Sequence, residues 1–406
     1  MDQPPISYAQ LIRLPNVLPL LLAIGLSRLA DRMFALAIVF HALAAFGSPA
    51  LAGWLAFAAA APGLVVSPLA GAFLDRAGAV RGIVVDLAAS TSLVLVLTAA
   101  IVLHDAGPPV LLVVATAYAL TSPLSASGVR VLLPRLVPVP ALERANALDM
   151  TIHAIVDVAA PSLAGALMGF AGPIATFIAI AAAYVATTIC LALVSGVSAP
   201  PPSAQKFLRQ ALEGLGYVLR SPLLRGLAIS YALNNFVWGV LVVAVPVFVA
   251  RRFGAGVWES VSGLLWADLG AASGIGALLA GRARIFGREV RVMALCMTAT
   301  ALALWPVAAT FGLAGLAAGM ALVGLLAGPI DVGLLTLRQR RTEPGRLGRV
   351  LTVSMALNTT GFPIGTALGG MLVTWSLQSA FVVAALASLL GALSAVTLIP
   401  AEDRDP

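Results

Sequence analysis

The sequence predicts an all-α membrane protein, and three observations support that fold class. Of the 406 residues, 60% are hydrophobic and 10% are charged, whereas a soluble domain carries roughly 25% charged residues to keep its surface wetted. The apolar residues form stretches of about 20 or more, the length that a helix needs to cross a bilayer. Lysine and arginine gather in every second break between the stretches, as in the cytoplasmic loops of membrane proteins.

Twelve stretches are long and apolar enough to be spanning helices. Breaks with glycine, proline or charged residues separate them, and a continuous helix between breaks pairs its own backbone groups, as lipid requires. The first stretch is too long for the apolar part of a signal peptide, so we interpret it as a retained helix. The stretches are residues 17–44, 50–73, 82–104, 108–132, 143–170, 173–197, 223–250, 257–281, 291–311, 313–336, 348–374 and 377–399.

The positive charges predict the orientation. Of the 24 lysine and arginine residues, Arg28 and Arg32 lie inside the first stretch, and Arg251 and Arg252 lie in an outer loop. The other 20, Arg338 among them, fall in cytoplasmic segments if both termini are cytoplasmic. An odd number of helices would divide these charges between the two sides. We therefore expect an integral membrane protein with both termini in the cytoplasm.

Residues 198–222 divide the stretches six and six. This segment begins with the proline-rich "SAPPPSAQK" and continues with apolar residues at helical spacing. It predicts a cytoplasmic linker with an amphipathic helix on the inner membrane surface, or alternatively a disordered linker. We expect residues 1–197 and 223–406 to form two six-helix bundles. A faint repeat of residues 144–168 at 349–373 favours two related halves.

A motif follows the second stretch, in the sequence "GAFLDRAGAVR". It resembles the signature loop of the major facilitator superfamily and occupies the same position, between helices 2 and 3. The resemblance implies two pseudo-symmetric six-helix bundles that rock around a central site. It also implies that Asp75 latches the halves together on the inner side against helix 11, with Arg130 as a possible partner; a solvated loop is the alternative. The latch candidates are Gly71, Asp75, Arg76, Gly78, Arg81 and Arg130.

Further segments resemble one branch of that superfamily. "LPRLVPVPALERANAL", "APSLAGALM" and "GRVLTVSMALNTTGFPIGTALGG" are similar to the bacterial drug:proton antiporters that include macrolide and siderophore exporters. We therefore expect a monomer in the lipids of a bacterial plasma (inner) membrane. "DRMFALA" also resembles helix 1 of ferroportin, a metal exporter, in which the aspartate shares a metal with a histidine one turn later. Here Ala35 occupies that position, and no converging set of metal ligands is visible. The sequence predicts no metal and no cofactor.

Charged residues inside the apolar stretches are the sharpest clue to function. A charge at the bilayer centre costs roughly 2.5–3.5 kcal/mol on insertion scales, so such a residue usually faces a cavity or a partner. Asp31, Asp157 and Asp268 fall near the middle of the first, fifth and eighth stretches. We expect at least one of Asp31 and Asp157 to carry the coupling proton, and Asp31 is the preferred candidate.

The fifth stretch also carries a polar face. Asn146, Asp149, His153 and Asp157 recur at spacings of three and four, which places them on one side of a helix. His153 can bond either aspartate across one turn, and such a row could relay protons. A buried structural network, with the arginines of the first stretch as counter-ions, is an equal alternative. The proton-coupling candidates are Asp31, Asp157, His153, Asp149 and Asp268.

Substrate-cavity candidates come from the first, seventh and tenth stretches. Amide groups and an aromatic face in the seventh could contact a ligand, although interhelical hydrogen bonds explain the same residues. The candidates are Arg28, Asp31, Arg32, Asn234, Asn235, Trp238 and Asp331.

The pattern excludes several classes of protein. The three histidines lie in different stretches, and neither a nucleophile–base pair nor a phosphate-binding loop is present, which argues against an enzyme. The basic residues follow helix ends and are not interleaved with aromatic residues, which argues against nucleic acid. We expect a proton-coupled exporter of a small amphipathic organic compound. The alternatives are a lysophospholipid or metabolite carrier, an importer, a ferroportin-like metal exporter, or a membrane scaffold or enzyme that does not transport.

Overall fold

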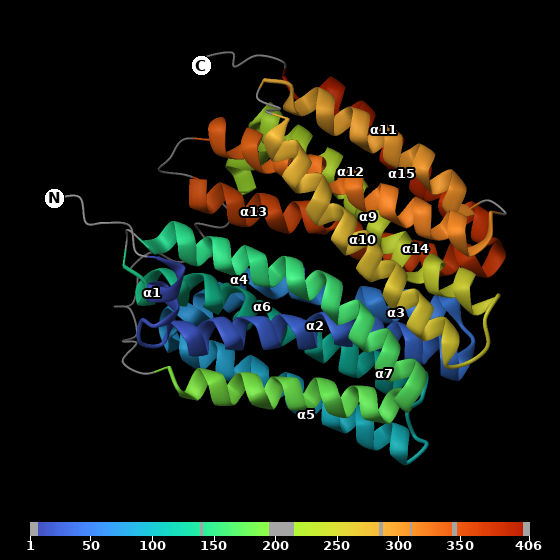
Figure 1. Ribbon diagram of the computed structural model, residues 1–406, viewed down its shortest axis with the longest axis horizontal. Helices are drawn as coiled ribbons and strands as arrows, with labels where there is room; N and C mark the ends of the chain where they lie inside the picture. The colour runs from blue at the N-terminus through green and yellow to red at the C-terminus, as the bar shows by residue number, and fades with distance from the viewer. Residues whose placement is uncertain are drawn as a thin grey trace. The chain divides into compact units, whose positions relative to one another are not determined.

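The chain is built from helices, as expected. The computed structural model describes residues 7–138, 141–194, 215–283, 287–308, 311–342 and 347–400, and this part of the chain contains helices but no strand. The linker prediction falls mainly on residues 195–214, which lie outside the described part. Figure 1 shows the helices with their labels.

Each of the twelve predicted stretches corresponds to helix. The helices before the linker are α1 (Tyr8–Ile12), α2 (Val17–Phe46), α3 (Pro49–Ala58), α4 (Ala61–Ala77), α5 (Ala79–Val102), α6 (Pro108–Leu136) and α7 (Leu142–Ala192). Those after it are α9 (Pro222–Ala250), α10 (Val257–Arg282), α11 (Glu289–Ala308), α12 (Gly312–Arg340), α13 (Leu347–Thr359), α14 (Gly361–Trp375) and α15 (Leu377–Leu398). Within the described residues, nine helical segments are long and apolar enough to cross a membrane; the count of twelve spans stays a prediction.

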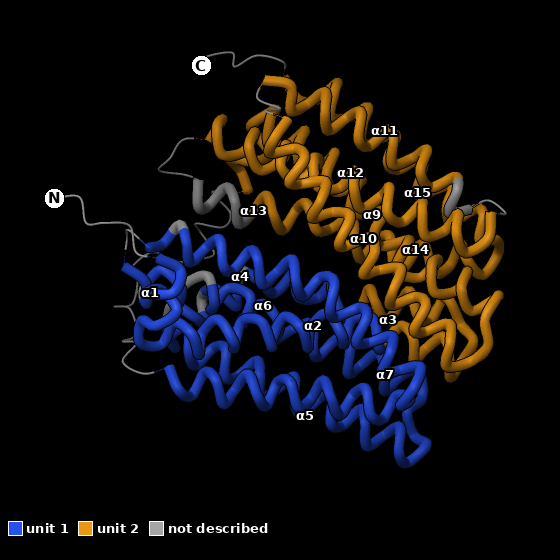
Figure 2. The backbone as a smooth tube through the Cα atoms, in the orientation of Figure 1, with its two compact units in different colours: residues 1–37, 58–208 blue, residues 38–57, 209–406 orange. Residues whose placement is uncertain are grey.

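Two compact units make up the chain (Figure 2). Unit 1 comprises Met1–Ala37 and Ala58–Leu208, and unit 2 comprises Ile38–Phe57 and Arg209–Pro406. The end of α2 and nearly all of α3 therefore pack with the C-terminal helices. The predicted division at the linker differs from this grouping only at residues 38–57 and within the linker itself.

In unit 1, α5 packs against α6 and α7, and α4 packs against α6. Helix α7 contains two of the predicted stretches. At Gly172 the backbone has φ 79° and ψ 179°, and Pro173 follows. A positive φ suits glycine, which has no Cβ. The turn therefore falls at the break that the sequence predicts between residues 170 and 173.

In unit 2, α9 packs against α14 and α15, and α12 packs against α10 and α11. Glycines bring these backbones together: a Cβ on Gly365 would lie 2.2 Å from the Phe236 carbonyl oxygen, and one on Gly276 would lie 2.0 Å from that of Leu325. Lipid supplies no hydrophobic drive for helix association, so close contact of small residues takes its place. Gly53 of α3 meets Gly370 of α14 in the same way.

Candidate functional site

Three charged side chains interrupt the apolar helix α2. Arg28, Asp31 and Arg32 lie within five residues of one another, and all three have polar partners inside unit 1. The residues that pair with them or donate hydrogen bonds to them lie on α6 and α7. This pairing is what a membrane helix requires of charged residues at depth.

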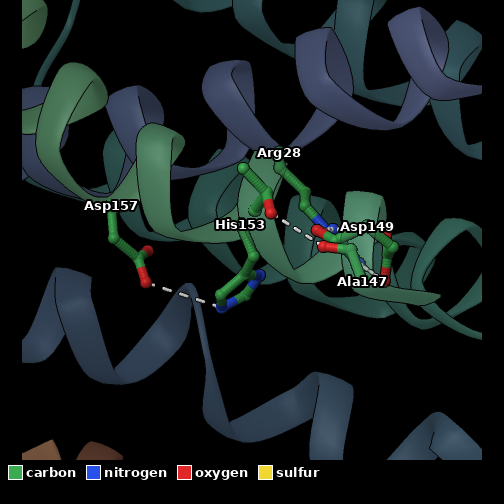
Figure 3. Close-up of polar contacts among 6 residues, drawn as sticks. Arg28, Ala147, Asp149, His153 and Asp157 are labelled. Atoms are coloured by element: carbon green, nitrogen blue, oxygen red, sulfur yellow. Dashed lines mark hydrogen bonds and ion pairs between the residues drawn. The ribbon is translucent and has the colours of Figure 1, made fainter. Parts of the chain in front are cut away.

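Arg28 forms a two-point ion pair with Asp149 of α7 (Figure 3). Its Nη1 lies 2.7 Å from Oδ1, its Nη2 lies 3.2 Å from Oδ2, and Nη1 also donates to the Asp149 backbone carbonyl at 3.3 Å. The planar guanidinium group matches the two oxygens of a carboxylate in this geometry. The contact fixes α2 against the first part of α7.

Asp157 joins a second pair, two turns further along α7. Arg32 Nε lies 3.2 Å from Asp157 Oδ1, and His153 Nε2 lies 3.5 Å from Asp157 Oδ2. Figure 3 shows His153 directed at Asp157 along the helix. The Asp157 side chain is 37% exposed and the His153 side chain is 41% exposed. The side chains of this pair are therefore more exposed than those of the Arg28–Asp149 pair.

Asp31 differs from its neighbours because tyrosines bind it. The hydroxyl groups of Tyr118 in α6 and Tyr184 in α7 donate to Asp31 Oδ1 at 2.6 and 2.7 Å, and the two hydroxyl oxygens are 2.8 Å apart. Both tyrosines are buried, at 5% and 1% exposed. Phe34 packs against the Tyr118 ring at 4.3 Å between centroids. One carboxylate thus sits in a site that is polar at the hydroxyl groups and aromatic around them.

Asp86 of α5 brings a further carboxylate to this region. It is 4% exposed, the Ser90 hydroxyl lies 3.4 Å from its Oδ1, and its charge interacts with that of Asp31. Among the side chains that the structure describes, the carboxylates of this region are Asp31, Asp86, Asp149 and Asp157, and Arg28 and Arg32 pair with the last two. The other two have hydroxyl groups as hydrogen-bond partners.

The candidates in unit 2 lie on α9, α10 and α12. The Tyr231 hydroxyl of α9 donates to Asp331 of α12, and Asn235 Nδ2 donates to the Asn358 backbone carbonyl of α13 at 3.0 Å. The Trp238 ring lies 6.2 Å from that of Trp266 in α10. Asn234 is buried, and Asp268 is exposed on α10.

The residues of the signature motif surround the joint between α4 and α5. Gly78, with φ 88° and ψ 150°, ends one helix and begins the next. Both arginines of the motif, Arg76 and Arg81, are exposed. The side chains of Asp75 and Arg130 lie outside the part of the molecule whose side chains are described, so the latch stays a prediction.

The sequence analysis missed the two tyrosines that bind Asp31. They come from helices far from α2 in the chain, and spacing within one helix cannot bring them together. A compositional signal was available, because the chain has five tyrosines and two of them lie in apolar stretches of the N-terminal half. For metals, no three His, Cys, Asp or Glu side chains group closely enough to bind an ion within the described residues.

Two relatives are similar to the chain, one over nearly its whole length and the other over little more than half of it. The MFS-type transporter y4rN of Sinorhizobium fredii is 48% identical over 395 residues, which cover 97% of this chain and 98% of that protein. The enterobactin exporter EntS of Shigella boydii is 28% identical over 240 residues, covering 58% of this chain and 56% of EntS.

Solved structures show the same fold at low sequence identity. The nucleoside transporter NupG has a TM-score of 0.76 at 11% identity and covers 94% of this chain and 98% of its own. A bacterial homologue of ferroportin has a TM-score of 0.73 at 18% identity, with the same coverage. The D-xylose–proton symporter has a TM-score of 0.71 at 15% identity, covering 95% and 98%.

A family model settles the class of protein. The model described as Major Facilitator Superfamily matches residues 20–282 and 227–406. The fold resemblance to transporters and the relative that covers nearly the whole chain agree with that match. The chain is a membrane transporter rather than an enzyme, and it belongs to the Major Facilitator Superfamily.

Proposed function

We propose that the chain is a secondary active transporter that exports a small amphipathic organic compound in exchange for protons. The observation that carries the proposal is the Asp31 carboxylate, which two buried tyrosine hydroxyl groups bind at 2.6 and 2.7 Å inside an apolar helix bundle. The arginines on either side of Asp31 in α2 pair with Asp149 and Asp157. Asp31 thus accepts hydrogen bonds from hydroxyl groups, which can bind both its charged and its protonated form.

The hydroxyl partners make Asp31 a suitable proton carrier. A carboxylate locked to a guanidinium group is held in its charged form, whereas one bound to neutral hydroxyl groups can change protonation with its surroundings. Transporters of this plan alternate between two conformations that expose a midplane site to one side or the other. When such a change alters the solvation of a carboxylate, protonation and conformation become linked free energies. We assign the coupling proton to Asp31.

His153, which contacts Asp157, is the group that passes protons to or from Asp31 in this proposal. The His153–Asp157 contact at 3.5 Å is the more exposed part of the polar row on α7. Histidine changes its charge near neutral pH, which suits this role. In this proposal Arg28 and Asp149, which form the tighter ion pair, have a structural role.

Export is the favoured direction because a relative that carries a specific name is an enterobactin exporter. A carrier that imports a metabolite, or that moves a lysophospholipid, could use the same carboxylates. The proposal further places the protein as a monomer in the bacterial inner membrane, with both termini in the cytoplasm. The direction of transport separates these alternatives.

Proteoliposomes with an imposed proton gradient test the function. We expect the wild-type chain to move the amphipathic, zwitterionic dye rhodamine B uphill when protons flow the opposite way, and to move it downhill without a gradient. Asp31→Asn should abolish uphill transport and preserve downhill exchange. Asp105→Asn is the matched control, because Asp105 is an exposed carboxylate between α5 and α6. Full gradient-driven transport in both Asp31→Asn and Asp157→Asn would sink the proposal.

A further inference from the structure

The last turn of α12 contains a buried arginine that the proposed proton site does not involve. Arg338 is 2% exposed and is the largest of the fully buried side chains in the described chain. Taking a guanidinium group out of water is expensive unless an anion or several hydrogen-bond acceptors compensate for it. The compensation at Arg338 is therefore informative.

The hydrogen-bond partner of Arg338 is a neutral amide. In the amide orientation that satisfies both of its neighbours, the Asn358 side chain accepts a hydrogen bond from Arg338 Nη2 at 2.6 Å and donates one to the Ser354 carbonyl at 3.0 Å. The nearby ionisable group is the Tyr231 hydroxyl, which donates to Asp331. No carboxylate of the described residues pairs with Arg338. The positive charge is thus buried beside hydroxyl and amide groups.

Two donors in this network have no partner. Arg338 Nε and Ser354 Oγ are both buried and make no hydrogen bond within the described residues. Ser354 as a whole is fully buried. Buried polar atoms without partners are rare in native structures, and each one calls for an explanation such as a missing ligand. The Asn358 side chain bonds to both residues, through Nη2 of Arg338 and the backbone carbonyl of Ser354, so the two unpaired donors belong to neighbouring residues.

The surroundings hold these donors in place. Asn235 of α9 donates to the Asn358 backbone carbonyl, so α13 is tied to α9 at the residue that binds Arg338. Ser354 and Asn358 are four residues apart and share one face of α13. Side chains fixed in this way lose little conformational entropy when a ligand binds.

We propose that Arg338 and Ser354 bind the acidic group of the compound that the protein transports, which is therefore an organic acid or a zwitterion. A carboxylate has two oxygens, and these can accept from the unpaired Nε and from the Ser354 hydroxyl at once. The planar, permanently charged guanidinium group suits such two-point recognition better than an ammonium group does. This proposal names the substrate class of the proposed transporter and rests on that function.

Binding to the purified full-length chain in detergent, without any proton gradient, tests the assignment. The probes are three carboxylates, acetate, benzoate and naphthoate, and the neutral amides acetamide, benzamide and naphthamide. A ligand that binds the native state raises the unfolding temperature in proportion to its occupancy. We expect at least one carboxylate to stabilise the wild type more than its amide does.

Substitutions then locate the effect. Arg338→Gln and Ser354→Ala should each weaken carboxylate binding, by about tenfold or more for Arg338→Gln, since a hydrogen bond to a charged group contributes about 1.5–3 kcal/mol. Arg340→Gln is the matched control, because it removes an arginine two residues away that pairs with Glu289 at 2.8 Å. If Arg338→Gln does not fold, Ser354→Ala and Arg338→Lys decide the question, with weakened binding expected in both.

Three results would overturn the proposal. The first is that no carboxylate stabilises the wild type more than its amide does. The second is that carboxylate binding survives unchanged in the variants at Arg338 and Ser354. The third is that vesicle-derived phosphatidylglycerol, and none of the carboxylates, gives stabilisation that depends on Arg338, because the anion would then be a lipid headgroup. Since the assay uses no gradient, failure of the Asp31 proton site would leave its outcome unaffected.

Discussion

The Arg28 guanidinium group and the Asp149 carboxylate contact each other at two points, with nitrogen–oxygen distances of 2.7 and 3.2 Å. The two side chains are 27% and 20% exposed, so water screens the pair only in part. They join helices that are 121 residues apart in the chain. The pair is therefore a tertiary contact that stabilises unit 1, and its removal should lower the free energy of unfolding.

A charge exchange tests this pair. Arg28→Asp and Asp149→Arg should each reduce the free energy of unfolding by about 2 kcal/mol or more, because each variant brings like charges together in a partly buried site. The double variant restores opposite charges, and we expect it to recover at least half of the loss. Thermal unfolding in detergent measures the change. Arg81→Asp, at an exposed position on α5, serves as the control, and a double variant no more stable than either single one would contradict the pairing.

The tyrosine hydroxyl groups at Asp31 can be removed without removing the rings. Tyr184→Phe should cost about 2 kcal/mol of stability, since it deletes a hydrogen bond to a carboxylate in a buried site. The same substitution in an Asp31→Leu background should cost clearly less, because the acceptor is already gone. Such non-additivity is the signature of direct contact. Equal losses in both backgrounds would show that Tyr184 stabilises the fold through some other contact.

Tyr8→Phe gives the matched control for that experiment. Tyr8 is 48% exposed near the start of the described chain, and loss of a hydroxyl group there should change stability by less than about 0.5 kcal/mol. The same variants also test function. If Asp31 carries the coupling proton, Tyr118→Phe and Tyr184→Phe should change the pH profile of gradient-driven transport, whereas Tyr8→Phe should not.

The close packing at Gly53 and the open space at Gly274 predict different effects of the same glycine-to-alanine substitution. A Cβ on Gly53 would lie 2.4 Å from the Thr366 carbonyl oxygen and 2.9 Å from the Gly370 Cα, so Gly53→Ala should destabilise the chain by about 1–3 kcal/mol. Nothing lies within 4 Å of the corresponding atom at Gly274 in α10. Gly274→Ala should be neutral, or stabilising by up to about 1 kcal/mol through helix propensity. Unfolding temperatures compare the two, and equal tolerance at both positions would argue against close packing of α3 on α14.

The orientation in the membrane is open to a direct test. In a chain whose cysteines, Cys190 and Cys296, are replaced by serine, Arg251→Cys should react with a membrane-impermeant maleimide added to intact cells. Ser7→Cys should react only after the membrane is made permeable, because the charge bias places the N-terminus inside. Labelling of Ser7→Cys from outside would reverse the predicted topology.

The helices could be predicted because apolar stretch length and charged breaks leave few alternatives in a membrane. The interior breaks were less accessible: residues 50–73 divide between α3 and α4, and 348–374 divide between α13 and α14 at Thr360. Pro363 lies just after the second break, and its missing N–H and its ring disrupt the preceding turn. Pro161 lies within α7 with no division beside it, so proline alone does not predict a break. Close packing contributes here, because a Cβ on Gly361 would lie 1.7 Å from the Ala232 carbonyl oxygen of α9.

The site was predictable only where its spacing is local. The contact of His153 with Asp157 follows from their separation of four residues, and the arginines of α2 were the obvious counter-ions for α7. The tyrosines at Asp31 depend on how three helices meet, which no local pattern encodes. Arg338 was grouped with the cytoplasmic bases by its place at a helix end. Its long side chain is buried and hydrogen-bonds to Asn358, which a charge count cannot reveal.

The backbone conformation of Gly172 favours an achiral or a D-residue at the turn within α7. At φ 79° and ψ 179° its backbone has a conformation that L-residues rarely adopt, and nothing lies within 4 Å of the position that a side chain would occupy. The turn therefore excludes L-residues because of their backbone preference and not because of the size of their side chains. A D-alanine placed there by chemical synthesis would match the mirror-image backbone that L-alanine resists. The turn at the middle of α7 thus depends on glycine, the one genetically encoded residue that is achiral.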